Sequence, residues 1–116
     1  MKVNRFTEVA QYTAPNHHNC SSFRLQGWDA SDSANFWVGL THFLPGGGAS
    51  YESTPLEKVY VVLNGEITVL TEGGEVVLRA FDSCHIPPNE ARSVTNRTNN
   101  PATMLVVMPY PEAQGK

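Results

Sequence analysis

The sequence lacks the features that define several large classes of protein. No apolar stretch approaches the roughly eighteen residues of a membrane-spanning helix, and the start, MKVNRFTEVAQYT, has no signal-peptide core. Basic residues are the minority, with eight Lys and Arg against eleven Asp and Glu, and they form no stripe that would suit nucleic acid. We therefore expect a cytoplasmic protein with neither a membrane nor a nucleic-acid partner.

Cysteine is scarce as well, with only Cys20 and Cys84 in the chain. In a reducing compartment two such residues are expected to be free thiols, which excludes a disulfide framework. The 116 residues are enough for one hydrophobic core and too few for two. The sequence therefore predicts a single domain over residues 1–116.

Helical periodicity is nearly absent, and short β-prone runs take its place. Asn64-Gly65 is a strong hairpin signal between two of these runs. The run over 36–44 is expected to end at the Pro-Gly-Gly-Gly stretch that follows it. Together the runs predict an all-β domain, most simply a barrel. The predicted strands cover residues 21–26, 36–44, 58–63, 66–71, 76–80, 93–96 and 103–108.

Three polar side chains stand at even spacing just before and within the hairpin: Glu52, Thr54 and Lys58. In an extended chain, even spacing sends side chains to one face of the sheet. A carboxylate, a hydroxyl and an ammonium are therefore expected to point to the same place.

Two stretches resemble the conserved motifs of the cupin superfamily. PGGGASYESTPLEKVYVVLNGEITV resembles G-x5-H-x-H-x3-E-x6-G, in which Gly46 and Gly65 take the terminal glycines. FDSCHIPPNEARSVTN resembles G-x5-P-x-G-x2-H-x3-N, in which Pro87 and Asn96 match. The resemblance implies a cupin-type, jelly-roll-like antiparallel barrel over about residues 36–108, preceded by an N-terminal arm over 1–35. It also implies a homodimer.

The departures from the cupin motifs fall on the metal ligands. The four slots that hold a metal in metal-binding cupins are occupied here by Glu52, Thr54, Lys58 and Arg92. Two of these side chains are cations, and a guanidinium does not lose its proton in proteins. We therefore expect no metal and no other cofactor. Phe81 and Asn89 also replace the two glycines of the second motif. The sequence therefore does not predict the shape of these loops.

The substituted slots favour a site for a small anionic or carbonyl-containing molecule. Arg92 is expected to grip carboxylate or carbonyl oxygens, Lys58 to act as base or nucleophile, and Glu52 to shuttle a proton. Alternation and the resemblance imply that further side chains line the pocket and contact the substrate. These are Trp37, Thr41, Thr54, Tyr60, Val94, Met104, Val106 and Met108.

Several functions are compatible with this site. The preferred interpretation is a metal-independent lyase, isomerase, cyclase or decarboxylase. One alternative is a non-catalytic module that binds or senses a small anion, and another is a metal-dependent oxygenase with unusual ligands. Glu52, Lys58 and Arg92 could also be a paired ion network with no ligand at all.

The remaining histidines give weaker signals. His42 is one residue out of phase with the inward positions, so it is expected to face outward. His17, His18 and Cys20 form a cluster in what is expected to be an N-terminal loop, and no role follows from it.

Overall fold

Antiparallel strands make up nearly all of the regular structure in the computed structural model, which describes residues 1–111. The helix content of that part of the chain is one 3₁₀ turn, η1 (Phe6–Glu8). No helix of these residues is long and apolar enough to span a membrane. The strands are β1 (Gln11–Tyr12), β2 (His17–Gln26), β3 (Trp37–Glu52), β4 (Lys58–Asn64), β5 (Glu66–Thr71), β6 (Gly74–Arg79), β7 (Ser83–Ile86), β8 (Arg92–Thr95) and β9 (Ala102–Met108).

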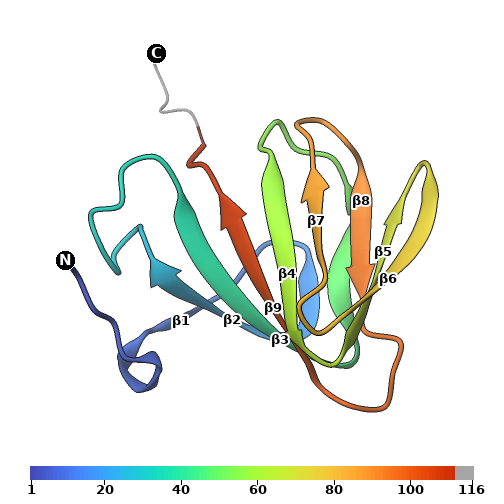
Figure 1. Cartoon of the computed structure of the whole chain (residues 1–116), viewed down its shortest axis with the longest axis horizontal. Coiled ribbons are helices and arrows are strands. Elements are labelled where there is room, and N and C mark those ends of the chain that lie inside the picture. The colour runs from blue at the N-terminus through green and yellow to red at the C-terminus, as the bar shows by residue number, and fades with distance from the viewer. Residues whose placement is uncertain (112–116) are drawn as a thin grey trace.

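The strands form one strongly curved sheet that closes nearly into a barrel (Figure 1). Hydrogen bonds join them in the order β6-β5-β8-β3-β9-β4-β7, while β2 pairs with β3 and β1 with β2. Every pair is antiparallel. The predicted all-β barrel is confirmed, although β1 and β7 were not among the predicted strands.

Strand β3 connects the two sides of the barrel (Figure 1). Its first half pairs with β9, from Trp37 opposite Met108 to Phe43 opposite Ala102, and its second half pairs with β8. The prediction that this strand ends at the Pro-Gly-Gly-Gly stretch is therefore wrong. Glycine allows the strand to continue here, because a Cβ on Gly48 would lie 2.0 Å from the carbonyl oxygen of Val94.

The N-terminal arm belongs to the barrel wall. The expected loop around His17, His18 and Cys20 is instead the first part of β2, which pairs with β3 along most of its length. A buried hydrogen bond of 3.0 Å between the hydroxyls of Ser22 and Thr41 ties the two strands together. A loop was predicted around these residues because the polar, histidine-rich stretch has little β-propensity, and pairing with β3 overrides that weak preference.

The two loops without their motif glycines keep a left-handed backbone. Phe81 has φ +71° and Asn89 has φ +68°, a region that glycine adopts most easily. Long-range backbone hydrogen bonds hold both residues. The Phe81 N–H donates to the Val62 carbonyl and the Asn89 N–H to the Thr54 carbonyl, each over 2.7 Å. The loop shape is therefore set by the surrounding barrel, even though the residues are strained.

The hydrophobic core fills the closed part of the barrel. Strands on both walls of the barrel contribute to it, because every second residue along much of β3, β4 and β5 points inward. Buried side chains at the open end of this core also form the floor of the cavity described below. The core comprises Phe43, Ala49, Tyr60, Val62, Ile67, Val69, Leu78, Ile86, Val94, Ala102 and Met104.

Candidate functional site

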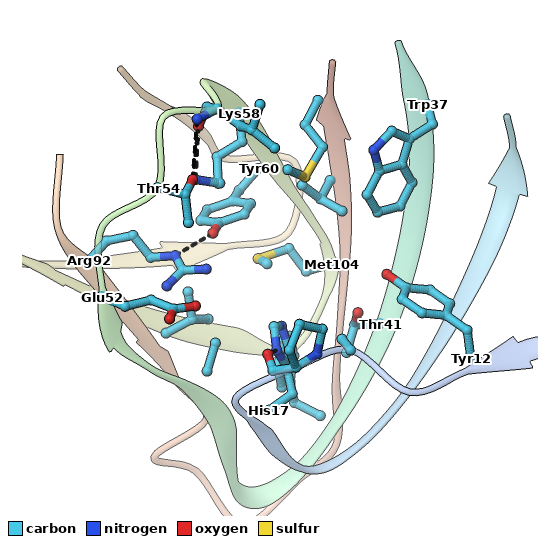
Figure 2. A pocket seen from close by; sticks show the side chains of 18 of the residues that line it. Tyr12, His17, Trp37, Thr41, Glu52, Thr54, Lys58, Tyr60, Arg92 and Met104 are labelled. Atoms are coloured by element: carbon cyan, nitrogen blue, oxygen red, sulfur yellow. Dashed lines mark hydrogen bonds between the residues drawn. The ribbon is translucent and has the colours of Figure 1, made fainter. Parts of the chain in front are cut away.

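A cavity of about 270 Å³ opens into the barrel between β1, β2, β3, β4, β8 and β9. Figure 2 shows two contrasting sides, with polar side chains from β3, β4 and β8 on one and aromatic rings from β1 and β3 on the other. We call the side of Glu52, Lys58, Tyr60 and Arg92 the polar end. This volume suits a ligand of about the size of a monosaccharide or a small acid.

All of the residues predicted for the site line this one cavity. Their catalytic and binding roles stay predictions. The placement of most of them follows from the alternation of inward positions in β3, β4, β8 and β9, whereas Glu52 follows a register shift in β3 and Thr54 lies in the loop before β4. The set is Glu52, Lys58, Arg92, Trp37, Thr41, Thr54, Tyr60, Val94, Met104, Val106 and Met108.

Arg92 is fixed by neutral partners and lies at the start of β8. It is only 5% exposed. Its Nε donates to the Tyr60 hydroxyl over 2.7 Å (Figure 2), and its Nη1 donates to the Ser50 carbonyl over 3.2 Å. Burial raises the pKa of Tyr60 even though the Arg92 charge opposes the rise, so this hydroxyl stays protonated at neutral pH. Among the described residues Nη2 of Arg92 has no partner, which leaves one N–H pair for a ligand.

Lys58 begins β4 and is 4% exposed. Its Nζ donates to the hydroxyl of Thr54 over 3.2 Å and to the carbonyl of Leu56 over 3.1 Å. Burial lowers the pKa of Lys58, the Arg92 charge lowers it further, and Glu52 opposes both. A buried ammonium next to a guanidinium gives up its proton more readily than an ordinary lysine.

Glu52, Thr54 and Lys58 all line the cavity, as predicted, but not because they are evenly spaced along one extended strand. Residues 53–57 form a loop and no extended strand, so strand parity does not carry across them. The loop folds back through the hydrogen bonds of Thr54 with Leu56 and Lys58. Lys58 therefore reaches the cavity as the first inward position of β4.

Glu52 ends β3 opposite Arg92 in the strand register. Its Oε2 accepts a hydrogen bond of 2.8 Å from the Asn16 side chain. The salt bridges among residues 1–111 all lie elsewhere, so no ion pair within 4.0 Å joins Glu52 to Lys58 or Arg92. The paired ion network considered from the sequence is therefore wrong, and the carboxylate is free to act on a ligand.

His17 is a cavity residue that sequence reasoning missed. Its Nδ1 donates to the Pro15 carbonyl over 2.7 Å, so the neutral ring carries its lone pair on Nε2. Burial lowers the pKa of His17 and Arg92 lowers it further, while the hydrogen bond to Pro15 opposes them. The ring is thus neutral at pH 7. His42, as predicted, is absent from the lining and bonds Thr103 instead.

The opposite wall, which we call the aromatic end, comprises the predicted Trp37, two lining residues that sequence reasoning missed, Tyr12 and Arg24, and Trp28, which packs behind them. The guanidinium carbon of Arg24 lies 4.2 Å from the Tyr12 ring centre and 4.6 Å from that of Trp28. The rings of Trp28 and Trp37 meet edge to face at 6.1 Å. Alternation from Ser22 to Arg24, beyond the register shift at His18 and Cys20, could have placed Arg24 on an inward face, but only if the arm had been assigned to the barrel.

The donors in the cavity do not fit a divalent metal. Metal sites of this kind need several imidazole, thiolate or carboxylate ligands, and among residues 1–111 no three His, Cys, Asp or Glu side chains converge. Glu52 and the neutral His17 are the two suitable donors of the lining. Arg92 and Lys58 beside them would repel the ion.

Comparison with known proteins gives the family. The cupin domain matches residues 39–108. The chain is 45% identical over 114 residues to the beta-D-galactosidase Rv1717 of Mycobacterium tuberculosis strain H37Rv, which covers 98% of each chain. The similarity therefore extends over nearly all of both chains.

Solved structures agree with this assignment. The polyketide cyclase RemF from Streptomyces resistomycificus has a TM-score of 0.83 at 18% identity, covering 94% of this chain and 79% of that one. A cupin-superfamily sugar phosphate isomerase from Silicibacter pomeroyi has a TM-score of 0.80 at 24% identity, covering 96% and 76%. Likeness at these identities shows the fold alone. The chain belongs to the cupin family.

Proposed function

We propose that this chain hydrolyses β-D-galactosides in the barrel cavity. The observation that carries the proposal is the 45% identity over 98% of both chains to a relative named as a beta-D-galactosidase. The cavity supports it, because its volume suits one sugar ring and its lining combines a carboxylate with aromatic rings. Aromatic faces pack well against the apolar face of galactose.

We assign to Glu52 the activation of the water molecule that attacks the anomeric carbon. Glycosidases commonly use two carboxyl groups, whereas Glu52 is the one carboxylate in the lining. In the proposed step, a water molecule attacks the anomeric carbon while Glu52 takes a proton from that water. The bond between the anomeric carbon and the glycosidic oxygen breaks, and the leaving oxygen gains one proton, so galactose and a free alcohol result.

Lys58 is the proposed source of the proton for the leaving oxygen. Its pKa is lowered by burial and by Arg92, which makes the ammonium a better acid than an exposed lysine. His17 is less suited to this role because its neutral ring has no proton to give from Nε2. Arg92 is assigned to bind sugar hydroxyls through its free Nη2.

The test is release of 4-nitrophenol from 4-nitrophenyl β-D-galactopyranoside by the full chain. We expect turnover that Glu52→Gln reduces about 10³-fold, within the range of general acid–base catalysis. The matched control is Glu57→Gln, which removes an exposed carboxylate that is hydrogen-bonded to His85 and lies outside the cavity lining, and which should keep full turnover. Turnover that survives Glu52→Gln, or none in the wild type, would refute the proposal.

A second candidate is the metal-independent lyase, isomerase, cyclase or decarboxylase expected from the sequence. The specific observation in its favour is that two buried cations, Lys58 and Arg92, face one carboxylate. Such a charge balance stabilises an enolate or carboxylate better than the cationic transition state of glycoside cleavage. This candidate predicts thermal stabilisation by small carboxylates that Arg92→Leu abolishes. Stabilisation without any turnover would instead identify an anion-binding module.

A further inference from the structure

We propose that Arg24 and Trp37 form an anion-binding subsite at the aromatic end, and that the substrate carries a carboxylate or phosphate group that binds there. The inference rests on the proposed function for the sugar part of the substrate. It adds that the sugar or its leaving group is charged and that the charge lies away from the bond that breaks.

Trp37 presents a donor without an acceptor. The residue is 7% exposed, and its Nε1 is fully buried with no hydrogen-bond partner among the described residues. Figure 2 shows the indole nitrogen turned toward the cavity. Buried N–H groups are nearly always paired, because an unpaired one loses its hydration without compensation. A ligand oxygen in the cavity would supply the missing acceptor.

Arg24 presents a cation without an anion. Its guanidinium lies between Tyr12 and Trp28, and its Nε is buried with no partner. None of the salt bridges among residues 1–111 includes Arg24. Stacking satisfies the faces of a guanidinium but leaves its N–H edges unpaired. Those edges match a carboxylate or a phosphate with two parallel hydrogen bonds.

The position of the subsite separates it from the catalytic groups. Tyr12 and Trp37 lie on the side of the cavity opposite Arg92, Glu52 and Lys58 (Figure 2). Arg24, Tyr12 and Trp28 also precede the residues 39–108 that match the cupin domain. The subsite is thus built by the N-terminal strands of this chain, which is where a substrate preference of its own would arise.

The test is calorimetric titration of the full chain with D-galactose, D-galacturonate, D-galactose 6-phosphate and benzoate. We expect both charged sugars to bind about tenfold more tightly than galactose. Tighter binding of D-galacturonate would identify a carboxylate as the preferred group, and tighter binding of D-galactose 6-phosphate a phosphate. Equal affinity for galactose and the charged sugars would overturn the subsite and leave the proposed function standing. Binding of benzoate through Arg24, with no binding of any sugar, would support the subsite and refute the galactosidase.

Variants tie the preference to the named atoms. Arg24→Gln should abolish the preference for charged sugars, and Arg24→Lys should keep only part of it, because an ammonium lacks the guanidinium fork. Trp37→Phe keeps the ring, loses the N–H and should weaken binding. Arg79→Gln, an exposed arginine paired with Glu66, is the matched control. A preference that persists in Arg24→Gln, with an unchanged melting temperature, would overturn the inference.

Discussion

The two ends of the cavity satisfy their polar groups in different ways. At the polar end, Arg92 and Lys58 already bond to Tyr60, Thr54 and backbone carbonyls. At the aromatic end, Arg24 and Trp37 hold buried N–H groups that no described residue accepts. The first arrangement fixes the proposed catalytic groups before a ligand arrives, whereas the second, as we propose, is completed by a ligand. We infer that the polar end supplies chemistry and the aromatic end supplies selectivity.

The largest expected effect separates turnover from binding. Glu52→Gln should reduce hydrolysis about 10³-fold while the affinity for D-galacturonate stays within about twofold of the wild type. The glutamine keeps the shape of the side chain and can still bond to Asn16. Turnover assays and calorimetry on the same preparation measure both quantities. A parallel loss of affinity would mean that Glu52 mainly holds the ligand, which breaks the division between the two ends.

A smaller effect is expected at Lys58. Lys58→Met should reduce turnover about 10²-fold and remove the alkaline limb of its pH profile. Because the ammonium is the proposed proton donor, activity should fall as pH rises through its pKa, which burial and Arg92 hold below that of an ordinary lysine. Initial rates between neutral and alkaline pH measure this limb. An unchanged alkaline limb in the variant would exclude Lys58 as the donor.

A double-mutant cycle tests whether the two ends act independently. Arg92→Leu and Arg24→Gln should each weaken D-galacturonate binding about tenfold, and the double variant about a hundredfold. The two residues share no hydrogen-bond partner in the structure, so their losses should multiply. Calorimetry on the four proteins gives the coupling. A double variant no weaker than either single variant would show that both arginines grip the same ligand group.

The smallest effect concerns stability at mildly acidic pH. Because the pKa of folded His17 lies below that of an unfolded histidine, about 6.5, the unfolded chain binds more protons as pH falls. The wild type should therefore lose stability below this pH relative to His17→Gln. Denaturant unfolding of both proteins at several pH values measures the difference, and the other three histidines contribute equally to both. A difference that does not vary with pH would contradict the lowered pKa.

The sequence predicted the polar end well for a definable reason. Both cupin motifs keep their spacing, so Glu52, Thr54, Lys58 and Arg92 could be assigned to one cavity although none is a histidine. Alternation then supplied the apolar lining. These are local patterns in strands whose pairing the motif already implies.

The aromatic end could not be predicted in the same way. Tyr12 and Arg24 depend on how β1 and β2 pair with the barrel, and the register of β2 shifts twice along its length. The shift between His18 and Cys20 accompanies the left-handed Asn19 and breaks the alternation on which such a prediction rests. The continuation of β3 was missed because three glycines in a row usually mark a turn.

The homodimer implied by the resemblance stays a prediction. Analytical ultracentrifugation would measure the oligomeric state.

The continuous course of β3 limits how this protein can vary in length. One strand carries Trp37 near its start and Glu52 at its end, with the glycines 46–48 between them. Inserting or deleting a single residue at these glycines would move the side chains of one half of β3 to the other face of the sheet and leave those of the other half in place, because side chains alternate along a strand. Glu52 would then turn out of the barrel while Trp37 stayed inside. Homologues that share this site should therefore vary freely in the loops 27–36 and 97–101 but keep the length of this segment constant.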